Sequence, residues 1–155
     1  MMESLRVGIR VPDVEQARTF YCGLGFEEVG AVPGPDGHPI LAILHWRGAH
    51  LILEALDGMP IQDVTRERRI QEGPRGLGVA IGMSVDDLAS VYEYCQDHAC
   101  EITAEPNDEP YGDRVFECFD PYGYLWEFSM PIAEQEPERA IAATSNEWFG
   151  DPRQE

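Results

Sequence analysis

The sequence predicts an α+β fold of two tandem βαβββ modules, which form a curved mixed sheet around a central trough. Three observations lead to this prediction. They are a weak internal repeat with an offset of 74 residues, an alternating strand at the start of each half, and a capped helix directly after each of these strands. At this offset Asp13 matches Asp87, and Phe20 matches Tyr94. The two halves therefore share one order of elements.

The first module is predicted to span residues 4–56. Apolar and other residues alternate from Leu5 to Val11, as in a strand with one buried face. Asp13 then caps a helix that begins at Val14 and ends at the glycines of GLGF. Further strands are expected over residues 27–32, 40–46 and 49–56, the last two joined by a tight hairpin at Arg47-Gly48.

The second module is predicted to span residues 78–131, and it repeats the order of the first. Asp87 caps a helix from Leu88 to Asp97, and DPYG at 120–123 is a type I turn. The expected strands cover residues 79–85, 101–105, 115–119 and 124–130. Residues 1–131 are thus expected to form a single domain.

Two further segments flank or separate the modules. The connection 57–77 carries the arginine-rich sequence TRERRI, which is either a solvated short helix or a subunit contact. The tail 132–155 is polar and acidic. We expect it to be loosely held, unless Trp148 and Phe149 attach it to the body.

The composition excludes several classes of function. The chain has 155 residues, with 11 Lys+Arg against 29 Asp+Glu, and its net charge of −18 would be repelled by a phosphate backbone. No apolar run approaches the roughly 20 residues of a membrane span. We therefore expect a cytoplasmic protein with no nucleic-acid or membrane partner, whose acidity serves either solvation or function. The four cysteines lack CxxC spacing and are expected to be reduced, mostly buried and without a metal or redox role.

Two sequence stretches carry a family resemblance. RVPDVEQARTFYCGLGF opens the first half, and PYGDRVFECFDPYGYLWEF closes the second. Together they resemble the vicinal oxygen chelate superfamily, which includes glyoxalase I, extradiol dioxygenases, fosfomycin-resistance enzymes and bleomycin-resistance proteins. For metalloenzymes of this superfamily the resemblance implies a divalent metal in the trough, held by the first and last strand of each half. The matching positions here are Arg6, Glu54, Ala80 and Glu127.

This residue set predicts a protein without metal or another cofactor. Two carboxylates are too few for a transition metal, since catalytic zinc normally keeps three protein ligands. A guanidinium at Arg6 would repel the cation and is expected to neutralise Glu54 or Glu127 instead. His45 and His50 face each other across the hairpin, but four residues separate His50 from Glu54, which is roughly 13–14 Å along a strand. The histidines therefore cannot complete the family's site.

The trough is expected to bind a small molecule. Its face of the opening strands presents small residues such as Gly8 and Gly82, which indicate either a cavity or close contact between the halves. Nearby aromatic residues are either ligand platforms or core, and acidic residues favour a cationic guest. The predicted ligand-binding residues are Arg6, Arg10, Trp46, Glu54, Ala80, Tyr111, Asp113, Phe116 and Glu127.

The resemblance is strongest to the bleomycin-resistance-like branch, and it implies a non-catalytic homodimer that sequesters a cationic or aromatic, antibiotic-like compound. Two alternatives stay open. One is a metal-dependent enzyme of the glyoxalase or dioxygenase type that uses Glu54 and Glu127 with a further ligand. The other is a protein-interaction module that uses the arginine cluster and the acidic tail.

Overall fold

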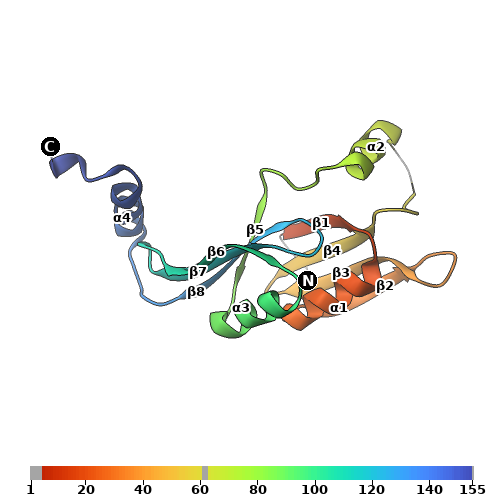
Figure 1. Cartoon of the computed structure of the whole chain (residues 1–155). Coiled ribbons are helices and arrows are strands. Elements are labelled where there is room, and N and C mark those ends of the chain that lie inside the picture. Colours follow the sequence, from red (N-terminus) through yellow and green to blue (C-terminus); the bar gives the residue numbers. More distant parts are fainter. Residues whose placement is uncertain (1–4, 61–62, 155) are drawn as a thin grey trace. The chain divides into compact units, whose positions relative to one another are not determined.

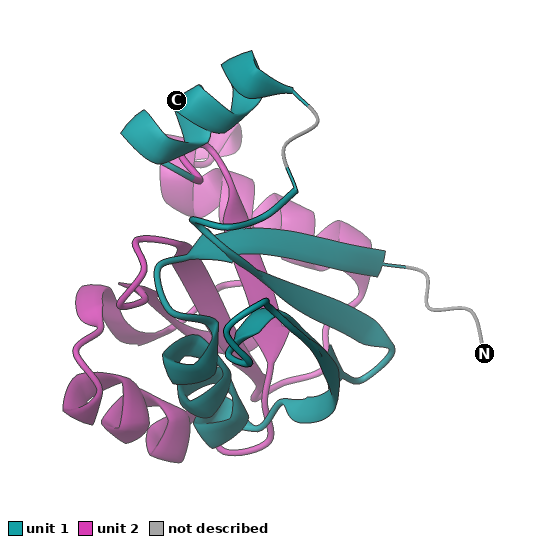
Figure 2. Ribbon diagram, turned by 90° about the vertical axis from the view of Figure 1, so that its right-hand side faces the viewer, with its two compact units in different colours: residues 1–75 teal, residues 76–155 magenta. Residues whose placement is uncertain are grey.

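The computed structural model describes residues 5–60 and 63–154, so residue 4, where the first module was predicted to begin, lies outside the described residues. The chain divides into two compact units, Met1–Arg75 and Gly76–Glu155 (Figure 2). The boundary falls inside the predicted connection 57–77. Whether residues 1–131 act as a single domain with a shared trough stays a prediction.

The first unit is a βαβββ module followed by one more helix (Figure 1). Strand β1 is parallel to β4, while β4, β3 and β2 are antiparallel neighbours, giving the order β1-β4-β3-β2. This arrangement leaves one sheet face for the helix α1 and one face open. The elements are β1 (Leu5–Val11), α1 (Val14–Leu24), β2 (Glu27–Pro33), β3 (Pro39–Trp46), β4 (Ala49–Ala55) and α2 (Val64–Glu72).

Helix α1 forms where the sequence predicts it. The side chain of Asp13 accepts a hydrogen bond from the backbone N–H of Gln16 at 3.0 Å, and Gly25 ends the helix in the left-handed region. Its apolar face is buried against the sheet, and the alternation in β1, β3 and β4 supplies the other half of the core. The buried residues are Val14, Ala17, Phe20, Tyr21 and Leu24 of the helix with Ile9, Val11, Leu44, Leu51 and Leu53 of the sheet.

The second unit repeats this topology in the order β5-β8-β7-β6, with β5 parallel to β8. Its core lies between α3 and one sheet face, where Trp126, Phe116 and Phe128 are almost completely buried. The predicted α+β class and the paired βαβββ modules are therefore confirmed. The elements are β5 (Ala80–Ser84), α3 (Leu88–Asp97), β6 (Glu101–Asp108), β7 (Asp113–Phe119), β8 (Leu125–Pro131), α4 (Pro137–Phe149) and a 3₁₀ turn, η1 (Pro152–Gln154).

The tail contains the helix α4, which the sequence analysis did not foresee. Its apolar side chains are not buried, since Ile141 is 70% exposed, Trp148 67% and Phe149 82%. Within the described part of the chain, Trp148 and Phe149 are therefore not buried against the body. Of the helices in the described ranges, none combines the length and apolarity that crossing a bilayer requires.

Replacing Gly25 with alanine should destabilise the first unit. Gly25 has φ 118°, and a Cβ there would lie 3.0 Å from Cζ3 of Trp46. We expect Gly25→Ala to lower the free energy of unfolding by about 1–2 kcal/mol, because the side chain is strained in this backbone region and meets a packed ring. Gly30→Ala is the control, since its Cβ would meet nothing within 4 Å. Urea unfolding should show a change within about 0.5 kcal/mol for this control; equal losses would contradict the strain argument.

Candidate functional site

The open face of the first sheet carries Arg6 and Arg10 on β1 and Glu54 on β4. The parallel β1–β4 register sets Arg6 opposite His50 and Arg10 opposite Glu54. Arg6 is thus four residues from the position that faces Glu54. The expectation that Arg6 neutralises Glu54 is therefore wrong, because the register gives that place to Arg10. The alternative, that Arg6 neutralises Glu127, stays a prediction.

Arg10 holds two carboxylates at once. Its Nε donates to Oε2 of Glu54 at 3.3 Å, and its Nη1 and Nη2 donate to the two carboxylate oxygens of Glu67 at 2.8 and 2.9 Å. Nη1 also reaches the carbonyl of Ala55. The Arg10 side chain is 11% exposed. The hydrogen bond from Arg10 lowers the pKa of Glu67, and the one to Glu67 raises the pKa of Arg10.

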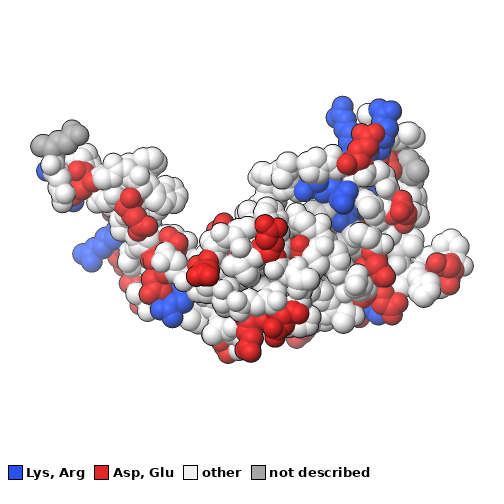
Figure 3. Space-filling view, viewed as in Figure 1, with Lys and Arg blue, Asp and Glu red and all other residues white. Residues whose placement is uncertain are grey.

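These contacts attach α2 to the first sheet. Glu67 lies on α2, and Gln71 of the same helix donates to the carbonyl of Leu56. The arginines of TRERRI, which are Arg66, Arg68 and Arg69, stay exposed on the helix, where Figure 3 shows positively charged side chains gathered. The segment is a solvated helix fixed through Glu67; a role in a subunit contact stays a prediction.

The histidine pair forms as predicted but lies away from Glu54. His45 and His50 are opposite one another, with ring centroids 5.6 Å apart. Nε2 of His45 accepts a hydrogen bond from the backbone N–H of Gly48 at 3.1 Å, so this nitrogen is engaged in the hairpin turn. His50 is four residues before Glu54 on β4, which keeps both rings out of the family's metal position.

Glu127 is the corresponding carboxylate of the second unit, and its surroundings are the opposite of those at Glu54. On the open face of the sheet it lies between Gly82 of β5 and Glu117 of β7, which are its direct cross-strand partners. Burial raises the pKa of Glu127, and the charges of Glu117, Glu109 and Asp113 raise it further. No cation contributes to this shift. Glu127 is therefore a partly buried carboxylate surrounded by other carboxylates.

Tyr111 lies beside this acidic group. It belongs to the loop between β6 and β7, and its pKa is raised by burial and by the charges of Glu127, Glu109 and Asp113. The nearby cation Arg114 pairs with Asp108 through Nη2 and Oδ2 at 3.1 Å. The loop is held by Gly112, whose carbonyl accepts hydrogen bonds from Ile132 and Ala133. Tyr111 thus presents a phenol ring next to an uncompensated negative charge.

Tyr111 also borders an apolar hollow of about 380 Å³ beside α4. The hollow lies within the second unit, so one residue adjoins both an apolar surface and the acidic group around Glu127. Its other lining residues are Ala140, Ile141, Thr144, Ser145, Trp148 and Phe149.

Two predicted ligand-binding aromatics lie elsewhere. The ring of Trp46 contacts Phe26 on the α1 side of its sheet, with centroids 6.1 Å apart, and Arg47 lies over it at 4.8 Å. Phe116 is 0% exposed and stacks on Phe128 at 5.0 Å. Strand periodicity sends both side chains to the helix-covered face, away from Glu54 and Glu127. This corrects the expectation that Trp46 and Phe116 contact a ligand on the open faces.

The donor set does not fit the divalent metal that the family resemblance implies. Arg10 engages Glu54, while the residue opposite Glu127 is Gly82, and Ala80 at the mapped position lies opposite Leu125. Neither Gly82 nor Ala80 has a side-chain donor, and catalytic zinc normally needs three protein ligands. No step of a reaction can be derived through such a metal from these residues.

Sequence reasoning missed three groups of residues. Glu117 would have been found from the β7–β8 register, because the DPYG turn sets it opposite Glu127. Glu67 lies on α2, and no sequence motif predicts that this helix contacts the first sheet. Cys95, Cys100 and Cys118 were expected to be buried thiols without a metal or redox role, and no sequence pattern indicated that they lie together on the α3 side of the second sheet.

Comparisons with known proteins agree with this architecture. A model of the Glyoxalase/Bleomycin resistance protein/Dioxygenase superfamily matches residues 4–128. An uncharacterized protein of Mycobacterium bovis is 28% identical over 141 residues, which cover 90% of this chain and 91% of that protein. A glyoxalase/bleomycin resistance protein/dioxygenase family enzyme from Burkholderia phytofirmans PsJN has a similar fold, with a TM-score of 0.65 at 15% identity, covering 81% of this chain and 96% of that one.

TioX from Micromonospora sp. ML1 also has this fold, with a TM-score of 0.61 at 20% identity, covering 82% of this chain and 97% of that one. At these identities the solved structures establish the fold alone. The family model covers most of the chain and matches both modules. The chain therefore belongs to the glyoxalase/bleomycin resistance protein/dioxygenase superfamily.

Proposed function

We propose that this protein binds and sequesters a small cationic, aromatic compound without transforming it, in the manner of the bleomycin-resistance-like branch of its superfamily. The observation that carries the proposal is the carboxylate group around Glu127, which we call the acidic cradle and which consists of Glu109, Asp113, Glu117 and Glu127. Tyr111 beside it supplies an aromatic surface.

The acidic cradle favours a cation for an electrostatic reason. Burial raises the pKa of Glu127 and the neighbouring carboxylates raise it further, which means that its ionised form is disfavoured in the free protein. A bound ammonium or guanidinium group would relieve that repulsion and would be attracted by all four charges. At Glu54 this need is already met by Arg10. The second unit is thus the better candidate for cation recognition.

The apolar hollow supports the aromatic part of the proposal. Exposed Trp148 and Phe149 border it together with Tyr111, which adjoins Glu127. Flat rings can stack on such side chains, and a cation gains further attraction over an aromatic face. A ligand with a planar ring and a positive charge would satisfy both surfaces.

The residues at the family's metal positions support binding rather than catalysis. Neither Arg6 nor Ala80 provides a metal ligand, and Glu54 is engaged by Arg10. Members of the bleomycin-resistance-like branch form grooves at a subunit interface, so the proposal includes a homodimer. Sedimentation equilibrium tests this part separately, with a monomer at all concentrations contradicting it.

Titration calorimetry with paired compounds tests the ligand class. We expect cationic aromatic antibiotics, including bleomycin-type glycopeptides, to bind with micromolar or tighter Kd, and neutral analogues of equal size to bind at least about tenfold more weakly. Glu127→Gln should lower the affinity for the cationic compounds by about tenfold, since one charge at the binding surface is lost. The matched control is Glu93→Gln, the same charge change at an exposed position of α3, on the other side of the sheet.

The pH dependence gives a second readout of the same site. Because the pKa of Glu127 is raised, its negative charge is lost at a higher pH than that of an ordinary glutamate. Affinity for a cation of constant charge should therefore fall as the pH is lowered through this range, and the fall should be smaller in Glu127→Gln. Millimolar binding throughout the panel, or equal affinities for charged and neutral analogues, would contradict the proposal.

A further inference from the structure

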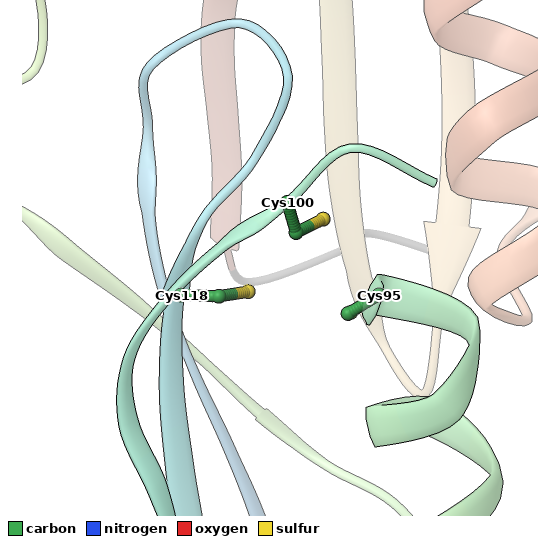
Figure 4. A group of neighbouring side chains, drawn as sticks. All are labelled: Cys95, Cys100 and Cys118. Carbon is green, nitrogen blue, oxygen red and sulfur yellow. The ribbon is translucent and has the colours of Figure 1, made fainter. Parts of the chain in front are cut away.

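Three cysteines of the second unit meet on the sheet face covered by α3 (Figure 4). Cys95 lies in the last turn of α3, Cys100 precedes β6, and Cys118 lies on β7. Their three Sγ atoms all lie within 4.8 Å of one another. Glu127 projects from the opposite face of the sheet, so this thiol cluster is separate from the acidic cradle.

The local fold determines this meeting. The backbone N–H groups of His98 and Cys100 both donate to the carbonyl of Cys95, at 3.4 and 3.2 Å, and Ala99 adopts φ 60° between them. The chain therefore reverses directly after α3 and returns Cys100 toward Cys95. In the β6–β7 ladder Ile102 pairs with Cys118, which brings the third sulfur level with the turn.

The cluster is largely shielded from water. Cys95 is 0% exposed and Cys118 1%, while Cys100 is partly exposed and offers a route of entry. The fourth cysteine, Cys22, lies in the first unit and is not part of this group.

We propose that Cys95, Cys100 and Cys118 form a binding site for a soft, thiophilic ion that is satisfied by three sulfur ligands. Thiolates select soft ions over hard ones. Bonds of about 2.3 Å place two sulfurs on one ion no more than about 4.6 Å apart, so small side-chain shifts suffice to close the site. Among the described residues, the group contains only these three thiols and no carboxylate or imidazole as a fourth ligand. Three-coordination is therefore favoured over a tetrahedral site.

The buried surroundings favour a trivalent ion, because three thiolates then form a neutral complex. An excess charge would be costly here, because Cys95 is 0% exposed and Cys118 1%. Arsenous acid meets this requirement. Three As–S bonds replace three As–OH bonds, the three thiol protons leave with the hydroxides as three water molecules, and no atom changes oxidation state. Monovalent copper has the right softness but leaves a negative complex, so we expect it to bind more weakly.

Native mass spectrometry of the full chain, kept reduced with a phosphine, tests the site. With arsenous acid we expect a 1:1 adduct whose mass gain equals one arsenic atom minus three hydrogens. At about 100 times Kd the melting temperature should rise by about 5–10 °C. Cys22→Ala should give the same adduct and the same shift.

Cys100→Ala is the informative variant, because this partly exposed position tolerates the change better than the two buried ones. The substitution should lower the affinity for arsenous acid by at least about tenfold. The adduct of this variant should lose only two hydrogens and keep one hydroxyl on arsenic. Cys118→Ala tests the same point from another ligand. Three results would each overturn the proposal: a wild-type adduct without the loss of three hydrogens, undiminished affinity in both variants, or an adduct that requires Cys22. If monovalent copper binds more tightly than arsenous acid, the assignment to a trivalent ion is wrong.

Discussion

Asp120→Ala should lower the free energy of unfolding by about 3–5 kcal/mol, the largest effect we expect from a single substitution in this chain. Asp120 is 5% exposed. Its Oδ1 accepts hydrogen bonds from the backbone N–H groups of Tyr122 and Tyr124 at 2.9 and 3.0 Å, and its Oδ2 accepts one from Nε1 of Trp126 at 2.8 Å. Truncation leaves these donors without this acceptor, two of them in buried surroundings.

Asp120→Asn separates the two oxygens. The amide oxygen can still accept hydrogen bonds from the turn, but the amide nitrogen would face the indole N–H of Trp126. We therefore expect Asp120→Asn to lower the free energy of unfolding, but by less than Asp120→Ala does. Urea unfolding followed by tryptophan fluorescence measures both variants. A loss below about 1 kcal/mol in Asp120→Ala would show that the turn does not depend on this carboxylate.

The modules were predictable because local signals agree with the tertiary structure. The alternation of β1 matches the burial of Ile9 and Val11, and Asp13 and Gly25 mark the ends of α1. Strand β6 is longer than predicted, extending to Asp108. Its final residues carry Pro106, Asn107 and Asp108, which have low strand propensity. Pairing with β7, including Asn107 opposite Val115, holds them extended.

The partner of Glu54 was not predictable in the same way. The alternation of odd and even positions along a strand, its parity, identifies the face on which Arg6 and Arg10 lie. It does not fix the register between two strands whose paired residues are 44 positions apart in sequence. A shift along β1 exchanges Arg6 for Arg10 without changing the face. Glu67 adds a contact from a separate helix, which no strand pattern contains.

Parity would have corrected two other expectations. Trp46 has the same parity on β3 as Ala42 and Leu44, both of which are buried against α1. Phe116 shares its face with Cys118, so the buried cysteine and the stacked ring belong to one core. The thiol cluster itself depends on the reversal at Ala99 and on the β6–β7 register, neither of which residue spacing reveals.

Arg10→Met is expected to lower the free energy of unfolding by about 2–3 kcal/mol and to release α2 from the first sheet. Methionine keeps much of the aliphatic volume but removes the donors to Glu54, Glu67 and Ala55. The two carboxylates then repel one another without a cation between them. Hydrogen exchange in α2 should accelerate, while exchange in α1 should change little. Arg68→Met is the control, because Arg68 is exposed and its ion pair with Glu72 is a long one of 4.0 Å between exposed side chains.

The pH dependence decides whether the ion pair itself carries this stability. Arg10 lowers the pKa of Glu67 in the folded state, so the contribution is present above the ordinary glutamate pKa of about 4.3 and is lost as the pH falls through the lowered value. The difference in unfolding free energy between wild type and Arg10→Met should therefore be largest near neutral pH and should shrink in acid. The raised pKa of Arg10 acts only at pH above its ordinary range, so it leaves this profile unchanged. A difference that is constant from pH 7 to pH 3 would mean that Arg10 stabilises the sheet through packing rather than through Glu54 and Glu67.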